Sequence, residues 1–146
     1  MSSPITETIT RRFSCRTFSG EALAEKDRVN LAEAAVAMTS GPFGSRLRFA
    51  LAAATPGDTA ALKRLGTYGM IRGASAFILG AAEPRGMYLE DFGYAMERLI
   101  LHATGLGLGT CWVGETPAPP VRPGCGSFPV RPAAGHAAAA GTGSAP

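Results

Sequence analysis

Two arginines and a serine lie within five residues near the N-terminus, in the segment Arg12-Phe13-Ser14-Cys15-Arg16. A guanidinium presents a planar fork of donors that matches phosphate oxygens, and a hydroxyl adds a donor from another direction. The spacing therefore favours a site for a single phosphate group. The alternative is an ordinary helix end, because arginines at a helix C-terminus also complement the helix dipole. Spacing alone leaves both interpretations open.

Two glycine-containing segments could let the backbone approach a flat ring. In the first, Ser40-Gly41-Pro42-Phe43-Gly44, glycine supplies unusual dihedrals and proline ends the preceding helix. The second spans residues 105–114 and contains Gly-Leu-Gly-Thr-Cys-Trp, so that Trp112 could form the wall of a cavity. Tight packing of a helix against a strand explains the same glycines without any ligand.

The cysteines and histidines give weaker signals. Cys111 lies in an apolar strand, where a buried and inert thiol is expected, because a reactive thiolate needs a basic neighbour or a helix N-terminus. Cys15 lies between serine and arginine but has no evident histidine partner. His102 is expected to be a packed helix residue. Two distant histidines and three scattered cysteines lack metal-ligand spacing, so no metal site is expected.

Seven elements are expected to position these residues. Apolar periodicity and turn signals predict helices over 4–13, 22–38, 58–65 and 87–104, and strands over 48–54, 74–82 and 108–113. Ile5, Ile9 and Phe13 would form one apolar edge of the first helix. The element order predicts an α/β (α+β) fold, a three-layer sandwich in which helices flank both faces of a central sheet.

Composition limits the classes of partner. The 146 residues suit one domain, and the net charge of +3 comes from scattered basic residues rather than a block, which argues against nucleic acid and anionic membranes. There is no apolar run long enough to cross a membrane and no pattern of a signal peptide. Three cysteines without paired spacing fit a reducing, cytoplasmic compartment.

The composition changes abruptly after residue 114. Residues 115–146 hold seven of the eleven prolines, and alanine, glycine and proline make up 20 of these 32 residues. The few large apolar residues there lie between prolines, which cannot donate to a sheet. We expect a folded domain over 1–114 and a disordered tail over 115–146.

Three stretches of the sequence, taken together, indicate a protein family more specifically than any one of them does alone. These are RRFSCRTF at 11–18, MTSGPFGSRLRFAL at 38–51, and LEDFGYAMERLILHATGLGLGTCWVG at 89–114. On these stretches the chain resembles the nitroreductase family of FMN-dependent NAD(P)H oxidoreductases, over about residues 5–114. The Gly-Pro-Phe-Gly loop is similar to that of a subfamily of nitroreductases with little assigned chemistry.

The resemblance implies a fold, a cofactor and a set of binding residues. The fold would be a nitroreductase-like sandwich. The cofactor would be FMN, with hydride arriving from NAD(P)H on flavin N5 and leaving by a ping-pong reaction to a nitroaromatic, quinone or similar acceptor. No catalytic acid or base is implied, because the protein mainly orients and tunes the flavin. Members are usually homodimers with two flavins at the interface, each site using both subunits. The residues implied to bind the cofactor are Arg12, Phe13, Ser14, Arg16, Ser40, Gly41, Pro42, Phe43, Ser45, Gly109, Thr110 and Trp112.

The chain also departs from the family pattern. A family member would continue past Val113-Gly114 with a second glycine, more helix and strand, and a late basic residue that also holds the phosphate. The alanine-, glycine-, proline- and arginine-rich sequence found here instead suggests a frameshift or a truncated reading frame, with a genuine low-complexity tail as the milder alternative. Two functional alternatives follow: a non-catalytic remnant, or a flavin-binding protein without reductase turnover.

Overall fold

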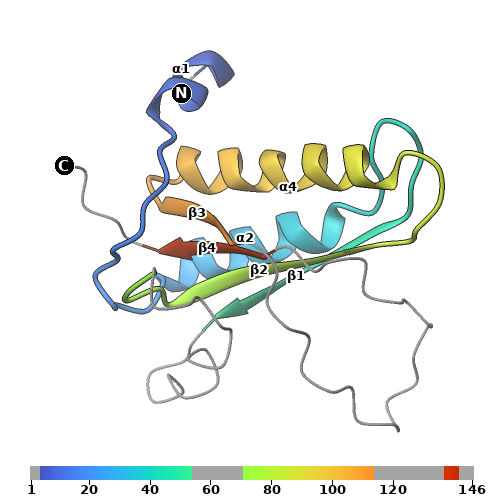
Figure 1. The fold of residues 1–146 in the computed structure, drawn as a ribbon. Helices are drawn as coiled ribbons and strands as arrows, with labels where there is room; N and C mark the ends of the chain where they lie inside the picture. Colours follow the sequence, from blue (N-terminus) through green and yellow to red (C-terminus); the bar gives the residue numbers. More distant parts are fainter. Residues whose placement is uncertain (1–3, 54–70, 114–136, 142–146) are drawn as a thin grey trace, which may run out of the picture.

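The computed structural model describes residues 4–53, 71–113 and 137–141 (Figure 1). The elements are α1 (Ile5–Arg11), α2 (Glu25–Ala37), β1 (Leu47–Ala53), β2 (Ala76–Ala82), α4 (Tyr88–Gly105), β3 (Gly109–Val113) and β4 (Ala137–Gly141). Every helix and strand predicted within these ranges is present, with bounds that differ by a few residues. The helix predicted over 58–65 lies outside the described residues.

The four strands form one sheet in the order β1-β2-β4-β3, with each neighbouring pair antiparallel. The strand that joins β2 to β3 therefore comes from the segment expected to be a disordered tail. That prediction is wrong for residues 137–141: Ala140 pairs with Ala76 on one side and with Thr110 on the other. Backbone groups make these bonds and need no particular side chain, so an alanine run can fill the gap. The rest of the predicted tail lies outside the described residues.

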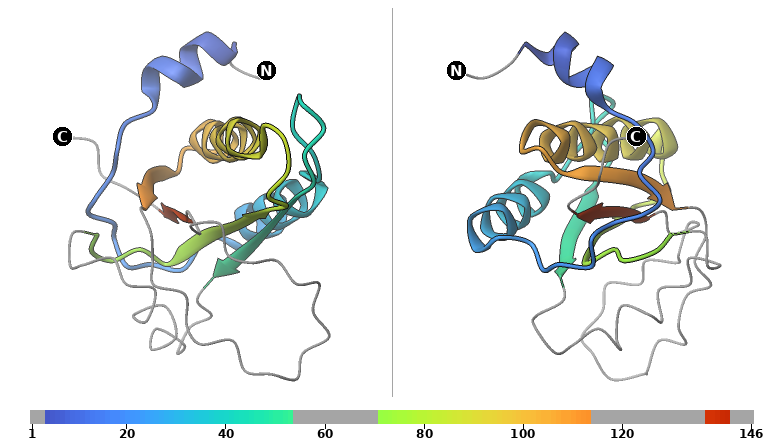
Figure 2. Two further views of the ribbon diagram at one scale, coloured as in Figure 1. Left: turned by 45° about the vertical axis from the view of Figure 1, so that its right-hand side comes forward. Right: turned by 90° about the vertical axis from the view of Figure 1, so that its left-hand side faces the viewer.

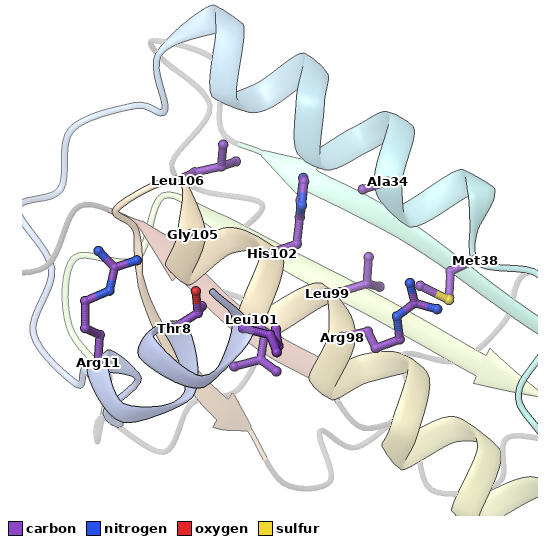
Figure 3. Close-up of a pocket in the computed structure, with 11 residues that line it drawn as sticks. Thr8, Arg11, Ala34, Met38, Arg98, Leu99, Leu101, His102, Gly105 and Leu106 are labelled. Carbon is purple, nitrogen blue, oxygen red and sulfur yellow. The ribbon is translucent and has the colours of Figure 1, made fainter. Parts of the chain in front are cut away.

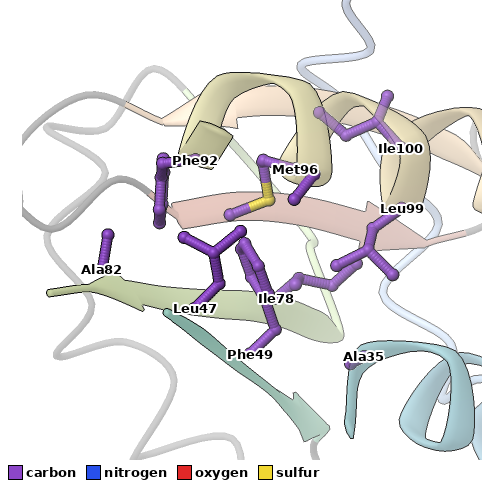
Figure 4. Close-up of a cluster of buried hydrophobic side chains, with 10 residues drawn as sticks. Ala35, Leu47, Phe49, Ile78, Ala82, Phe92, Met96, Leu99 and Ile100 are labelled. Carbon is purple, nitrogen blue, oxygen red and sulfur yellow. The ribbon is translucent and has the colours of Figure 1, made fainter. Parts of the chain in front are cut away.

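One face of the sheet carries the hydrophobic core. Side chains alternate along β1 and β2, and this face packs against α4 and α2 (Figure 4). The Phe49 and Phe92 rings stack with their centroids 5.4 Å apart. Gly80 makes room for them, because a Cβ at this position would overlap both rings. The core cluster comprises Ala35, Leu47, Phe49, Ile78, Ala82, Phe92, Ala95, Met96, Leu99 and Ile100.

The opposite face of the sheet meets an extended segment rather than a described helix. Phe77 lies on this face and packs against Cys15 and Phe18, while Arg48 and Ala50 alternate with the core residues and are exposed. The predicted α/β (α+β) class, with a sheet packed against helices, is confirmed. Among the described residues, the predicted helix layer is found on one face, since only that face presents large apolar side chains from both β1 and β2.

The first helix lies outside this core. In both views of Figure 2, α1 lies on the side of α4 that faces away from the sheet. Its predicted apolar edge is exposed in the single chain: Ile5 is 60% exposed and Ile9 54%. None of the described helices is long and apolar enough to span a membrane.

Candidate functional site

The N-terminal arginine segment and the strand that contains Trp112 lie side by side. Ser14 forms a parallel bridge with Thr110, and the Cys15 amide donates a hydrogen bond of 2.9 Å to the Thr110 carbonyl. The segment continues along the sheet, because the Arg72 amide donates to the Arg16 carbonyl over 2.9 Å. The structure thus brings Arg12, Ser14 and Arg16 next to residues 109–112 of β3.

Helix α4 contributes a carboxylate to the same place. Trp112 Nε1 donates a hydrogen bond of 3.0 Å to Glu97 Oε2. The other carboxylate oxygen, Oε1, is 3.8 Å from Arg12 Nε, and the Arg12 side chain is 26% exposed. Glu97 therefore joins the arginine segment to the tryptophan. No motif in the sequence pointed to Glu97, although it lies on α4 one residue from Met96 of the core face.

Two buried polar atoms at this junction have no hydrogen-bond partner among the described residues. They are Arg12 Nη1 and Thr110 Oγ1, and Thr110 is 2% exposed. Buried polar atoms are nearly always paired, so an unpaired donor and an unpaired hydroxyl on two adjoining segments mark a place where a ligand could supply the partner. Ser14 and Arg16, both exposed, add a hydroxyl and a second cation at the surface of the same segment. This donor set suits an anionic group such as a phosphate.

The two described cysteines do not form a nucleophilic site. Cys15 and Cys111 are both free and buried. Burial raises the pKa of the Cys111 thiol, and the positive charges of Arg16 and Arg12 oppose this only in part. The expectation that Cys111 is buried is confirmed, and its inertness stays a prediction. Within the described ranges, no group of three histidine, cysteine or acidic residues could hold a metal ion.

The loop over 40–45 is held by a buried carboxylate. Asp91 lies in the first turn of α4, and its two oxygens accept hydrogen bonds of 2.8 Å from the backbone amides of Phe43 and Ser45. Burial raises the pKa of Asp91, but the bonds from the Ser45 side chain and the two amides outweigh it, and the pKa lies below its ordinary value. Gly41 packs so closely that a Cβ there would overlap the Asp91 carboxyl. Gly41 is therefore needed for the packing of the loop against Asp91, whether or not the loop also binds a ligand.

The structure does not bring this loop to the arginine segment within one chain. Figures 1 and 2 show the loop between α2 and β1 near the N-terminal end of α4, with the arginine segment across the molecule. The loop binds Asp91 at the start of α4, whereas Glu97, further along the helix, meets the arginine segment. The predicted residues therefore form two groups. The residues of the loop group are Ser40, Gly41, Pro42, Phe43 and Ser45, and Phe43 is 61% exposed.

A cavity of about 750 Å³ lies between α1, α2 and α4 (Figure 3). Its lining includes Thr8 and Arg11 from α1, and Arg98 and His102 from α4. His102 is exposed rather than packed, and its Nε2 lies 2.5 Å from Asn30 Oδ1 of α2. None of the residues predicted to bind the cofactor lines this cavity, so it is separate from the site at Arg12 and Trp112.

Solved structures with the same fold include proteins described as nitroreductases. A nitroreductase from Desulfovibrio desulfuricans, in complex with FMN, is 26% identical, with a TM-score of 0.66 over 99% of this chain and 89% of the other. An FMN-dependent nitroreductase from Clostridium difficile R20291 is 15% identical, with a TM-score of 0.69 over 100% and 93%. A nitroreductase with bound FMN from Bacteroides fragilis NCTC 9343 is 20% identical, with a TM-score of 0.62 over 97% and 89%. A comparison with curated proteins finds no match.

The family assignment rests on the sequence as well as on the fold. The family model described as "Putative TM nitroreductase" matches residues 4–122. This match reaches past residue 114, where we expected the resemblance to end; the frameshift itself stays a prediction. Because the match covers most of the 146 residues and the fold agrees, the chain belongs to the nitroreductase family.

Proposed function

We propose that this protein is an FMN-dependent oxidoreductase that transfers hydride from NAD(P)H to a nitroaromatic, a quinone or a similar small-molecule acceptor. One observation carries the proposal: the segments that contain Arg12 and Thr110 pair side by side through Ser14, and each of these two residues has a buried polar atom without a hydrogen-bond partner among the described residues. Two of the similar nitroreductases are described with FMN bound, and a phosphate is the group that this donor set suits.

Each residue at the junction would make a different contact with the cofactor. Arg12, Ser14 and Arg16 would bind the phosphate. Thr110 would contribute a hydroxyl as a hydrogen-bonding group, and Trp112 would form the wall of the site on the β3 side. FMN supplies the redox chemistry when bound, and the protein binds and orients it. In this proposal no side chain has to donate or remove a proton, because the flavin supplies the redox chemistry.

The second group of predicted residues belongs to the proposal only if two chains combine. We propose a homodimer in which the loop over 40–45 of one chain completes the site at Arg12 and Trp112 of the other. Two amides of the loop are hydrogen-bonded to Asp91, and Phe43 is exposed. The exposed apolar edge of α1, Ile5 and Ile9, offers a surface that a second chain could cover.

Two free, buried cysteines are compatible with a cytoplasmic location.

Purification under native conditions tests the function directly. The measurements are the flavin absorbance of the protein and the oxidation of NADPH or NADH with a nitroaromatic or a quinone as acceptor. Bound flavin together with turnover supports the proposal. Bound flavin without turnover would identify a binding protein. A protein that takes up no flavin even when FMN is added would identify a remnant and contradict the proposal.

A further inference from the structure

Glu97 is the one acidic residue among the described contacts of the arginine segment with α4 and β3. We propose that Glu97 is a positioning residue for the flavin site: its carboxylate fixes Arg12 for the phosphate and ties that arginine to Trp112. This inference rests on the proposed function and names a residue that the family resemblance did not assign.

The geometry gives each carboxylate oxygen its own partner. Oε2 accepts the Trp112 Nε1 hydrogen over 3.0 Å, while Oε1 lies 3.8 Å from Arg12 Nε. Arginine has five N–H donors in a rigid fork, so pairing at Nε leaves the Nη groups for another acceptor. Arg12 Nη1 is buried and has no hydrogen-bond partner within the described part of the chain. The arrangement therefore holds the guanidinium from one edge and keeps a donor available at the other.

Position on the helix explains why Glu97 can do this. It follows Met96, which is fully buried in the core, so its backbone is fixed by the packing of α4 on the sheet. Trp112 lies on β3, which also packs against α4. Arg12, by contrast, follows the end of α1 in an extended conformation, outside any helix or strand. Arg12 there gains an orientation from a carboxylate that is carried on a packed helix, and this lowers the entropy lost when a phosphate binds.

If Glu97 acted only through its negative charge, removing that charge would affect FMN binding in the opposite direction. A carboxylate next to a phosphate site repels the phosphate, so removing the charge of Glu97 would tighten FMN binding. Positioning predicts weaker binding, and only for a ligand that carries the phosphate. Riboflavin has the same ring and ribityl chain as FMN but no phosphate, so it separates the two accounts.

The test compares four proteins: wild type, Glu97→Gln, Arg12→Ala and the double variant. Dissociation constants for FMN and for riboflavin are measured by equilibrium dialysis. The glutamine oxygen can still accept the Trp112 hydrogen bond, so this change removes the charge and spares that contact. Glu33→Gln, an exposed glutamate on α2, is the matched control. Trp112 is the one tryptophan of the chain, so its fluorescence reports whether the Glu97 contact is kept.

We expect Glu97→Gln to raise the dissociation constant of FMN about threefold to tenfold and to leave that of riboflavin unchanged. In the Arg12→Ala background, Glu97→Gln should have no further effect, because the residue it positions is gone. Unchanged or tighter FMN binding, or an equal loss for both flavins, would overturn the positioning role while leaving the proposed function intact. Failure of the wild type to bind either flavin would overturn both.

Discussion

At the scale of single residues, Asp91 shows how a buried charge can fix a loop. Its carboxylate has no exposed surface and accepts the amides of Phe43 and Ser45. Three hydrogen bonds stabilise the ionised form, and they keep the pKa of Asp91 below its ordinary value of 3.8 despite burial. The ionised carboxylate therefore contributes to the stability of the folded state.

This dependence predicts how stability changes with pH. Because the folded pKa of Asp91 is depressed, its contribution is complete above the pKa of the unfolded chain and is lost as pH falls through the folded value. In Asp91→Asn, one amide loses its acceptor, so we expect a melting temperature lower by about 5 °C or more at pH 7. On acidification below about pH 4, the melting temperature of the variant should then fall less than that of the wild type. Thermal melts of both proteins and of the control Glu90→Gln measure this; parallel profiles would contradict it.

Arg12 and Arg16 carry the prediction for cofactor binding. Helix α1 ends at Arg11, and the dipole at a helix C-terminus repels anions, so side-chain cations must attract the phosphate. Each charge-assisted hydrogen bond contributes roughly 1.5–3 kcal/mol, so the double change Arg12→Ala and Arg16→Ala should weaken FMN binding about 10²- to 10⁴-fold. Circular dichroism should remain that of the wild type.

The neighbouring Arg11 provides the control for this double change. It lies in the last turn of α1 and lines the separate cavity between the helices. Arg11→Ala should therefore leave the flavin content of the purified protein nearly unchanged. If the double variant keeps FMN at wild-type affinity, the arginines are an ordinary helix end and the phosphate site lies elsewhere.

At the scale of elements, periodicity predicted α4 well because its buried stripe is continuous. The apolar spacing within residues 87–104 predicts a core face that includes Leu89, Phe92, Met96 and Leu99. Phe92, Met96 and Leu99 are buried. Leu89, expected on the same face, is 56% exposed, whereas the neighbouring Tyr88 packs against the core cluster. Spacing predicts which side of a helix is apolar, but which residues at the edge of that side become buried depends on the tertiary packing.

Strand β4 could not be predicted for a different reason. Its sequence is four alanines and a glycine, with no alternation and low strand propensity. What makes it a strand is its register between β2 and β3, which is a property of the assembled sheet. The composition of the tail predicted disorder because composition carries no information on long-range pairing.

The position of β4 predicts a sharp boundary for truncation. A chain ending at His136 would lack β4 and would leave the facing edges of β2 and β3 unpaired, whereas a chain ending at Gly141 keeps both pairings. We expect the shorter chain to be insoluble or to lose its cooperative thermal transition, and the longer chain to melt within about 2 °C of the full-length protein. Equal melting temperatures for the two truncated chains would show that β4 does not stabilise the sheet.

At the scale of the whole molecule, the sequence grouped residues that one chain keeps apart. The motif-based set joined the loop over 40–45 to the segment around Arg12, and the structure places them across the molecule from each other. A motif gives the residue types that a site needs, yet it does not state which chain supplies them. Within a single chain, the arginine and tryptophan segments meet, and the loop is held by Asp91 instead.

The proposed homodimer would bring the two groups of residues together in one cofactor site. It leads to the last prediction. Ile9 lies on the exposed apolar edge of α1, so a charge placed there would have to be buried when a second chain covers the edge. We expect the wild type to have twice the 15.0 kDa chain mass by light scattering, and Ile9→Glu to shift the equilibrium to monomer. If the loop of one chain completes the site of the other, the monomer should also lose flavin, although Ile9 is not among the residues predicted to bind the flavin. Lys26→Glu, an exposed charge change on α2, should alter neither property. A monomeric Ile9→Glu that keeps its flavin would show that each chain holds the cofactor alone.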